Sequence, residues 1–500
     1  MISMKKHPVI FIFGLTILAW QSLAAAEVSS TTPADPFLPP NIPTPSFDQS
    51  KRYNVMDFGA TGKGQKNDTS AIDKAIDKCS ANGGGSVIFP AGTYLVASIH
   101  LKSNVQLLLD DQATIMGTKT GFDSPEKCDF DKYQDFGHSH YHDALMWGED
   151  IENFAIVGGT IDGGSLVHGN IKPGGGDKQI AIKTGKNLLF KNITQKIGGH
   201  FVYLLNNCEN VTITNVVIKN SRDAVDLMSC RNVQVSKCNF TECVDDTIGV
   251  KSDYVLGKTI KSENIYVWDC YFESGCNGLQ FGSETAGDFS NVNFWNIKIG
   301  KADKAGIGIT SCDGAVIDNV NYRDITMHNI ANPIFMLIID RLRTGDTTRK
   351  VGTIKNVTIS NVVATEVVGG RQGPAYPCTI SGRPDAYLEN IVLNNVSITY
   401  KGGGTQADAA VAPPPYSKDA YAPHDFGPRP ASGLYVRNVK GLQLHHVKFQ
   451  FETPDQRPPL IASDVDGLEL DNFESGKSDG VEATKFDGVK NLNVHDSPGL

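Results

Sequence analysis

Short apolar segments, each led by an asparagine, recur along most of the chain. Hydrophobic and polar residues alternate in each of them, as in NVTITNV from Asn210 and NVQVSKC from Asn232. Such alternation predicts half-buried β-strands. Further copies begin at Asn153, Asn187, Asn264, Asn291, Asn356 and Asn390, with looser ones at Gly314 and Gly441.

The spacing of these segments predicts how the strands are arranged. Most copies follow one another after intervals from the low twenties to the mid thirties of residues. Strands this short cannot bury an inner face alone, but stacking them coil on coil builds one continuous core. We therefore predict an all-β fold, a single-stranded right-handed parallel β-helix with asparagine or threonine stacks at its corners.

A short helix is predicted ahead of the repeats. It opens near Asp68, presents an apolar face formed by Ile72, Ala75 and Ile76, and stops at the glycine run of residues 83–85. Because a stack of strands must cover its first exposed edge, we expect this helix to cap the N-terminal end of the coil.

The first fifty residues carry an export pattern. Lys5 and Lys6 precede the apolar run of residues 9–20 and the small residues SLAAA, so residues 1–26 are predicted to be a signal peptide. The run is too short to span a bilayer comfortably, and no membrane anchor is predicted. Residues 27–50, rich in Pro, Ser and Thr, are predicted to be a linker, and residues 51–500 one catalytic β-helix domain. The protein is thus expected to be exported, either periplasmic or secreted.

The net charge and the cysteines limit which classes of partner, disulfide and metal site are expected. The formal net charge is -9 and no basic cluster is interleaved with aromatic residues, which argues against a nucleic-acid partner and favours a carbohydrate. The ten cysteines lie mostly in apolar segments, so buried free thiols and disulfides are both open. No Cys or His spacing is typical of a zinc site, and neither a metal nor another cofactor is predicted.

Three aspartates flank one of the predicted strands. Asp223 precedes the segment RNVQVSKCNF, and Asp245 and Asp246 follow it. Strands of successive coils lie about 4.7–4.9 Å apart, so these acids are expected to converge. Crowded carboxylates raise one another's pKa, which supplies an acid and a base for hydrolysing an acetal. Aspartates also bond backbone amides at turns, and this structural explanation stays open.

The repeats and acids together resemble the polygalacturonase family of glycoside hydrolases, family 28, in the pectin-lyase-like superfamily. Residues 57–76 and 89–96 resemble the superfamily's capping region, and GGTIDGG at 158–164 is similar to an early turn of the family. SRDAVD at 221–226 resembles the motif with the first catalytic aspartate, and VDDTIGVKS at 244–252 resembles the Asp-Asp segment with its lysine.

The resemblance implies roles for the three aspartates. Asp245 is expected to be the general acid, with Asp223 and Asp246 activating the water, and the family inverts configuration. Pectic or related polysaccharide, or an oligosaccharide derived from it, is the expected substrate. Lys251, Asn277 and Gln280 are candidates for binding sugar hydroxyls or carboxylates near the acids, and hydrogen bonding within the turns is the alternative for each of them.

Two family signatures are missing. Asn277 stands where the family has the histidine of Gly-His-Gly, and Gly308 and Thr310 stand where it has an Arg-x-Lys pair that binds a uronate carboxylate. Losing two cations removes charge-assisted hydrogen bonds. Other cations that can replace the pair are Arg222, His200, Arg341 and Arg371.

Residues 402–432 interrupt the repeats with Pro, Gly and Ala. A loop of this length inside a compact domain is usually functional or disordered. It contains aromatic and basic residues that can close one end of a groove and favour release of sugars from chain ends. These residues are Tyr416, Tyr421, His424, Phe426 and Arg429.

Two other functions stay open from the sequence. A β-helix lyase would be expected to use calcium and a basic proton abstractor. A non-catalytic carbohydrate-binding β-helix would explain the missing cations. The linkage, endo or exo action and the oligomeric state are not predicted.

Overall fold

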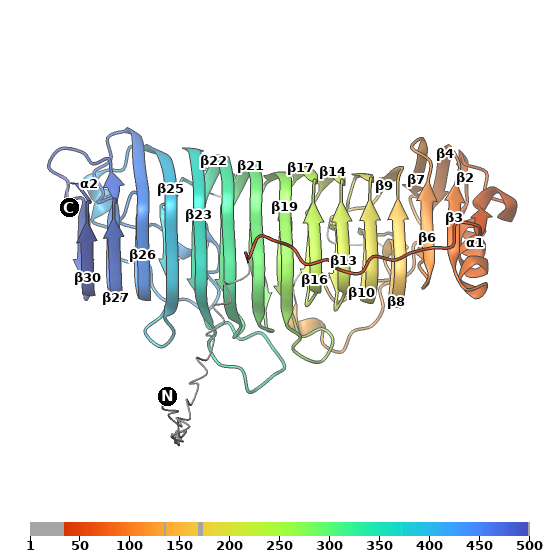
Figure 1. Ribbon diagram of the computed structural model, residues 1–500, viewed down its shortest axis with the longest axis horizontal. Coiled ribbons are helices and arrows are strands. Elements are labelled where there is room, and N and C mark those ends of the chain that lie inside the picture. The colour runs from red at the N-terminus through yellow and green to blue at the C-terminus, as the bar shows by residue number, and fades with distance from the viewer. Residues whose placement is uncertain (1–34, 135–136, 169–173, 372, 499–500) are drawn as a thin grey trace, which may run out of the picture.

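The computed structural model describes residues 35–134, 137–168, 174–371 and 373–498. Its strands lie side by side along one axis, from the N-terminal elements at one end to β30 at the other (Figure 1). The predicted signal peptide, residues 1–26, lies outside the described residues. The strands of the first half are β1 (Arg52–Asn54), β2 (Lys63–Asn67), β3 (Gly85–Phe89), β4 (Gly92–Val96), β5 (Ile99–His100), β6 (Val105–Leu109), β7 (Ala113–Gly117), β8 (Ala144–Val157), β9 (Thr160–Asp162), β10 (Lys178–Lys191), β11 (Thr194–Lys196), β12 (Phe201–Asn206), β13 (Glu209–Thr214), β14 (Val217–Ser221), β15 (Asp223–Met228), β16 (Arg231–Ser236), β17 (Asn239–Cys243) and β18 (Ile248–Ser252).

The second half continues the same coil with longer strands. They are β19 (Ser262–Ser274), β20 (Leu279–Thr285), β21 (Phe289–Ser311), β22 (Val316–Ile338), β23 (Thr353–Val367), β24 (Cys378–Ser381), β25 (Leu388–Gly402), β26 (Leu434–Thr453), β27 (Leu460–Asp471), β28 (Glu474–Ser475), β29 (Thr484–Asp487) and β30 (Lys490–His495). The few helices are η1 (Val55–Phe58), α1 (Thr69–Ala81), η2 (Asp131–Tyr133), α2 (Gln406–Ala409) and α3 (Pro423–Phe426).

Parallel pairing between successive turns closes the strands round an axis. Val225 pairs with Ile248, which pairs with Leu279, which pairs with Ile307, which pairs with Ile334. These side chains are fully buried and belong to one apolar core that runs nearly the whole length of the coil. The predicted all-β fold of parallel strands is confirmed, while the right-handed sense of the coil stays a prediction.

The leading asparagines of the repeats stack at a corner of the coil. The side-chain amide of Asn210 donates to Asn187 at 2.8 Å, that of Asn232 to Asn210 at 3.1 Å, and that of Asn264 to Asn232 at 3.0 Å. All four residues have φ between 54° and 57°. Asparagine tolerates this left-handed conformation better than most residues, which explains why it opens each repeat.

Helix α1 lies at the N-terminal end of the coil (Figure 1). Ile72, Ala75 and Ile76 are fully buried, as their spacing predicts. The predicted helix is therefore present, and its role as a cap stays a prediction.

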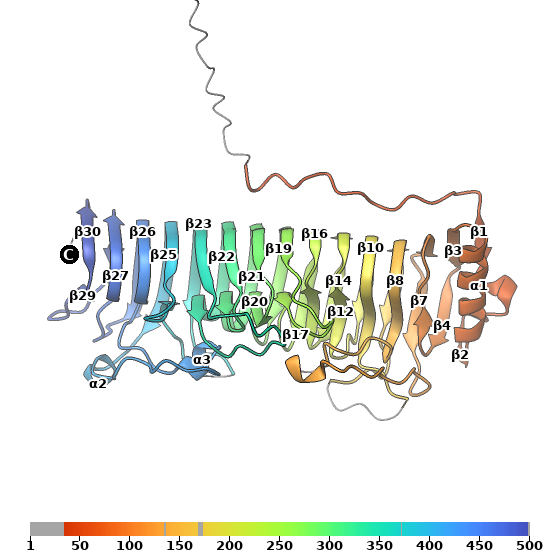
Figure 2. The same cartoon turned by 90° about the horizontal axis from the view of Figure 1, so that it is seen from below.

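The described part of the predicted linker, residues 35–50, runs along the outer face of the coil (Figures 1 and 2). The Phe37 ring packs edge-on against Trp295 at 5.8 Å, and the Arg323 guanidinium lies 3.9 Å from the centre of the Phe37 ring. Gln234 Nε2 donates to the carbonyl of Pro40 at 2.6 Å. This segment is thus attached to the coil by side-chain contacts.

All ten cysteines are free thiols, and all but Cys128 are buried. Of the two possibilities left by the sequence, the structure contains the buried thiols. Within the described ranges, no helix combines the length and apolar character needed to cross a bilayer.

Candidate active site

One pocket of about 130 Å³ contains every site residue predicted from the sequence. Pro423 of α3 lines it, and α3 lies on the side of the coil where the long loops gather (Figure 2). The six residues are Asp223, Asp245, Asp246, Lys251, Asn277 and Gln280.

The three aspartates of the pocket come from two successive turns of the coil. Asp223 opens β15, whereas Asp245 and Asp246 lie in the turn between β17 and β18. The carbonyl of Asp246 accepts from the backbone N–H of Ala224, and Asp245 N donates to the carbonyl of Arg222, both at 3.0 Å. The parallel pairing of neighbouring turns therefore brings the acids together, as predicted.

Arg222 forms ion pairs with two of the acids. Its Nη1 lies 2.5 Å from Asp223 Oδ2, and its Nη2 lies 2.8 Å from Asp245 Oδ2. The Asp223 side chain is only 2% exposed, compared with 24% for that of Asp245. Asp245 is thus the carboxylate more accessible to a substrate.

Hydrogen bonds join Asp246 to the turns of the coil on both sides. Asn277 Nδ2 donates to Asp246 Oδ1 at 2.8 Å, and the Asp246 backbone N–H donates to Asp223 Oδ1 at 3.0 Å. Asn277 Oδ1 in turn accepts from the backbone N–H of Ala305 at 3.1 Å. The residue at the family's histidine position therefore orients a carboxylate through its amide.

The pKa values of the three carboxyls diverge. Burial and the charge of Asp245 raise the pKa of Asp246 to about 6. Burial also raises the pKa of Asp223 well above its usual range, although Arg222 opposes the shift. Burial acts in the same direction on Asp245, but Arg222 and Lys304 outweigh it and lower the pKa of that carboxyl. The lowered pKa of Asp245 favours its ionised form, whereas the raised pKa of Asp246 brings that carboxyl closer to neutral pH.

Lys251 belongs to a buried charge cluster that lines part of the pocket. Its Nζ lies 2.8 Å from Asp226 Oδ2, and His138 Nε2 lies 2.9 Å from the same oxygen. All three residues are at most 5% exposed. Lys251 neutralises Asp226, and this ion pair fixes the Lys251 side chain where it lines the pocket.

The missing Arg-x-Lys pair has a structural counterpart. A Cβ atom at Gly308 would lie 2.0 Å from Gln280 Oε1, so the Gln280 side chain fills the space above that glycine. Gln280 Nε2 donates to the carbonyl of Phe281 at 2.7 Å, and Thr310 Oγ1 donates to the same carbonyl at 2.8 Å. Gln280 also donates to Thr310 Oγ1 at 3.3 Å, so uncharged, mutually hydrogen-bonded side chains lie where the family has its cations.

Most of the replacement cations suggested by the sequence are already engaged. Burial and Arg222 lower the pKa of His200 to about 2, so its imidazole is neutral. Arg341 binds Asp313 through Nε at 2.8 Å and Nη2 at 2.6 Å. Arg371 donates to the backbone carbonyls of Val244 and Gly275. Of the four, only Arg222 lines the pocket.

Residues 402–432 form one wall of the pocket, as predicted. Tyr421 and Pro423 line it, and the Arg429 guanidinium lies below them, donating to the carbonyls of Pro423 at 2.7 Å and Gly427 at 2.6 Å. Arg429 is 1% exposed and lies between aromatic rings, 4.5 Å from the centre of Tyr376. This loop is therefore packed against the coil.

Lys304 and His138 are two of the pocket residues that reasoning from the sequence missed. Lys304 lies in β21 at a register shift between Ala302 and Ala305, where the alternation of the strand is interrupted. His138 comes from the loop before β8, which has no repeat pattern. The interrupted alternation around Lys304 is the one sequence signal that points to either residue.

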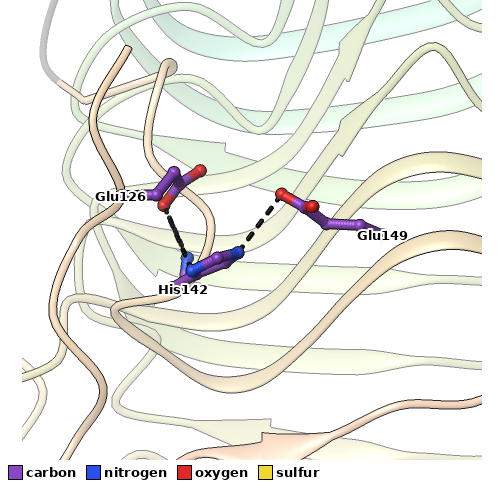
Figure 3. A group of neighbouring side chains, drawn as sticks. All are labelled: Glu126, His142 and Glu149. Carbon is purple, nitrogen blue, oxygen red and sulfur yellow. Dashed lines mark hydrogen bonds and ion pairs between the residues drawn. The ribbon is translucent and has the colours of Figure 1, made fainter.

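Two groups of side chains in the described part of the chain have the spacing of a metal site. Glu126, His142 and Glu149 form the first (Figure 3). Glu126 accepts from the backbone N–H of His142, and Lys183 Nζ lies 3.1 Å from Glu149 Oε1. Backbone and lysine partners thus satisfy these carboxylates.

The second group is Asp245, Asp246 and Cys276, whose ligand atoms lie within 4.8 Å of one another. Burial raises the pKa of the Cys276 thiol well above its usual range, so the sulfur stays protonated. Arg222 and Lys304 line the same pocket. A protonated thiol and two neighbouring cations make this a poor site for a cation.

Comparison with known proteins identifies the family of the chain. The model of glycosyl hydrolases family 28 matches residues 79–417, more than half of the chain. The chain is 26% identical over 294 residues to an endo-polygalacturonase of Pectobacterium carotovorum subsp. carotovorum, covering 53% of this chain and 70% of that protein. It is 30% identical over 287 residues to plasmin and fibronectin-binding protein A of Streptococcus pneumoniae (strain ATCC BAA-255 / R6), covering 56% of this chain and only 34% of that longer protein.

Two solved structures of exopolygalacturonases have a similar fold. A hyperthermoactive exopolygalacturonase from Thermotoga maritima superposes with a TM-score of 0.61 at 21% identity, covering 82% of this chain and 94% of that one. A family 28 exopolygalacturonase of Yersinia enterocolitica gives 0.59 at 18% identity, covering 88% and 78%. At these identities the likeness shows the parallel β-helix fold, and the match of the family model shows that the protein belongs to glycosyl hydrolases family 28.

Proposed function

We propose that the protein hydrolyses glycosidic bonds of a pectic or related polysaccharide. The observation that carries this proposal is the convergence of Asp223, Asp245 and Asp246 from two turns of the coil in one pocket. Family membership supports the same chemistry. Paired carboxyls with different pKa values are the usual equipment of glycosidases.

Asp245 is proposed as the general acid. Its carboxyl is the more exposed member of the pair bound by Arg222, so it can reach the oxygen of the bond to be cleaved. Since Arg222 lowers its pKa, the ion pair must loosen before Asp245 can carry a proton at the pH of the reaction. Substrate binding is the event that can change this balance of charge.

Asp246 is proposed as the main base that activates water, assisted by Asp223. A general base works best when its pKa lies near the working pH, and the pKa of about 6 at Asp246 meets that condition. The buried Asp223 carboxylate accepts the Asp246 backbone N–H and so fixes the position of this turn. Lys251, Asn277 and Gln280 are proposed to orient the sugar from the floor and edge of the pocket.

The size of the pocket favours attack at chain ends. Its volume of about 130 Å³ lies well below the roughly 300–1,000 Å³ of pockets for larger ligands. Tyr421, Ala422 and Pro423 wall it on one side. A pocket of this size suits one sugar ring, so we propose release of single sugars from an end of the polymer.

We further propose that residues 1–26 direct export and that residues 51–500 form one catalytic domain. In the same proposal the coil is right-handed and α1 covers its first turn. Family 28 membership and the buried core that spans the coil support this arrangement.

The test is a comparison of Asp245→Asn with the parent protein on defined pectic oligosaccharides. Parent protein should release new reducing ends without the ultraviolet absorbance of unsaturated uronates, and the anomer seen by NMR gives the stereochemistry. Asp269→Asn is the matched control, because Asp269 lies at a corner of the coil and bonds Asn296. Full activity of Asp245→Asn would remove the assignment of the acid, and unsaturated products would indicate a lyase.

A non-catalytic carbohydrate-binding protein is the second candidate. The observation that favours it is Arg222, whose guanidinium joins two of the acids needed for hydrolysis. The similarity to a plasmin and fibronectin-binding protein supports a binding role, although that relative is named for binding proteins. Sugar binding without release of reducing ends from any substrate in a polysaccharide panel would select this function.

A further inference from the structure

Lys304 enters the pocket through an irregularity of β21. Ala302 pairs with Ile330 and Ala305 with Asn332, so β21 has one residue more than β22 over this stretch. A β-bulge of this kind re-aims a side chain and is common next to active sites. The backbone N–H of Lys304 donates to the carbonyl of Cys276 at 2.8 Å, which fixes the bulge against the turn that carries Asn277.

The other two long cations of the pocket are already paired. Arg222 binds Asp223 and Asp245, and Lys251 binds Asp226. Among the described residues, no carboxylate lies within the 4.0 Å ion-pair distance of Lys304 Nζ. Burial lowers the pKa of Lys304, but Cys276, Asp245 and Asp246 raise it by more, so the lysine side chain is charged. Lys304 thus carries a positive charge that is not held in a close ion pair, although Asp245 and Asp246 stabilise it from a greater distance.

We propose that Lys304 is the specificity-determining residue that binds the carboxylate of a uronic acid residue in this pocket. The inference rests on the proposed function. Charge-assisted hydrogen bonds are strong ones, and a lysine lining a small pocket supplies such a bond to a sugar carboxylate but not to a neutral hydroxymethyl group.

The packing around Gly308 and Thr310 explains why the positive charge of the pocket comes from Lys304, in the β-bulge of β21. Gln280 occupies the space above Gly308, where a side chain would clash at 2.0 Å, and Thr310 is tied to the carbonyl of Phe281. Neither position can carry a cation into the pocket without displacing Gln280. Lys304 reaches the same pocket from four residues upstream of Gly308.

Binding at Lys304 also affects the proposed acid. The titratable and charged groups that face Asp245 are Arg222, Asp223, Asp246, Lys251, Cys276 and Lys304. Lys304 is one of the cations that lower the pKa of Asp245. When a substrate carboxylate pairs with Lys304, the negative charge opposes this effect and favours the protonated form of Asp245. A uronate therefore assists its own cleavage, whereas a neutral sugar does not.

The first experiment measures binding of monosaccharides, which the protein cannot hydrolyse. Galacturonate and galactose are titrated calorimetrically into parent protein, Lys304→Met, Lys304→Arg and the control Lys301→Met. Lys301 lies three residues upstream, pairs with Asp303 at 3.2 Å and does not line the pocket. We expect parent protein and Lys301→Met to favour galacturonate by about 10- to 100-fold, Lys304→Met to lose this preference and Lys304→Arg to retain part of it.

The second experiment compares oligogalacturonate with the same oligosaccharide after reduction of its carboxyls. For Lys304→Met, KM for oligogalacturonate should rise about 10- to 100-fold while that for the reduced substrate stays unchanged. A purely structural role of Lys304 would lower activity on both substrates equally. Equal binding of galacturonate and galactose by parent protein, or an unchanged preference in Lys304→Met, would overturn the inference.

The experiments distinguish a failure of the role inferred for Lys304 from a failure of the proposed hydrolysis. Binding of galacturonate that depends on Lys304, without release of reducing ends, would support this site and count against hydrolysis. Hydrolysis of neutral and uronate oligosaccharides at equal efficiency would support hydrolysis and count against this role of Lys304.

Discussion

Arg222 Nη2 lies 2.8 Å from Asp245 Oδ2, which joins the proposed general acid to a partly buried guanidinium. The same guanidinium binds Asp223, so one cation sets the charge of two carboxyls that come from neighbouring turns. His200 stays neutral beside it and accepts a hydrogen bond from Arg222 Nη1. The ion pair stabilises the ionised form of the acid in the unliganded protein.

Replacing Arg222 with glutamine is expected to raise the pKa of Asp245. An opposite charge within about 4–6 Å shifts the pKa of a carboxyl by roughly 1–3 units, and removing it reverses the shift. Because the pKa of Asp245 lies below that of Asp246, Asp245 sets the acidic limb of the kcat profile, and this limb should move to higher pH by about one unit. The maximal kcat should fall, because Asp223 and Asp245 lose the group that positions them. Arg231→Gln is the control, since Arg231 does not line the pocket and forms an ion pair with Glu209, with 3.6 Å between the charged atoms. An unmoved acidic limb in Arg222→Gln would contradict the assignment of Asp245.

The architecture was predictable because its signal is local and repeated. Each asparagine-led segment shows both the alternation of its strand and the corner residue with left-handed φ, as at Asn210 and Asn232. A stack of identical turns then places Asp223 near Asp245 and Asp246 from the spacing alone. One repeat of separation in the sequence is one turn of separation in space.

The electrostatics of the pocket were not predictable in the same way. The bulge that turns Lys304 inward depends on one unpaired residue in β21, and alternation alone cannot locate such a shift. The ion pairs of Arg222 depend on rotamers in a crowded pocket. His138 reaches Asp226 from a loop without periodicity, 88 residues away in the chain. These features arise from tertiary contacts, which a repeat pattern does not encode.

Asp253→Asn is expected to stabilise the protein at alkaline pH. Asp253 is 3% exposed, accepts the backbone N–H of Val255 through Oδ1, and has no partner for Oδ2 among the described residues. Burial raises its pKa to about 7. Between about pH 4 and 7 the folded protein holds a proton that the unfolded chain has released, so stability from this group falls as the pH rises.

The measurement is urea unfolding of both proteins at pH 5 and pH 8. The substitution replaces the buried carboxyl by an amide that carries no charge at either pH. The variant should therefore exceed the parent protein by about 1–3 kcal/mol at pH 8 and by less at pH 5. An advantage that does not grow with pH would show that Asp253 does not titrate in this range.

Phe37→Ser tests whether the N-terminal segment stabilises the coil. Phe37 packs against Trp295 and below Arg323, whereas its neighbour Leu38 is 75% exposed. Loss of an aromatic pair and a cation–π contact should cost about 1 kcal/mol and lower Tm. Leu38→Ser should leave Tm unchanged. Equal effects of the two variants would mean that residues 35–50 contribute nothing specific.

Arg437→Met is expected to release the loop that walls the pocket. Arg437 is 5% exposed, its guanidinium lies 4.1 Å from the centre of the Tyr416 ring, and its Nε donates to Ser381 Oγ at 2.7 Å. Nη1 donates to the carbonyl of Pro414, so one side chain joins the loop to β24 and β26. Removing these contacts should weaken the attachment of the loop by about 1–3 kcal/mol.

Limited proteolysis of the native protein is the measurement for this variant. Residues 402–432 of Arg437→Met should be cut faster by a non-specific protease than those of the parent protein, because local opening becomes more frequent. KM should rise as well, since Tyr421 and Pro423 of the same loop line the pocket. Lys440→Met is the control, because the exposed Lys440 lies over the Tyr387 ring, 5.1 Å from its centre, and not against the loop. If the loop of Arg437→Met resists the protease as well as that of Lys440→Met, the remaining contacts, above all those of the buried Arg429, hold the wall on their own.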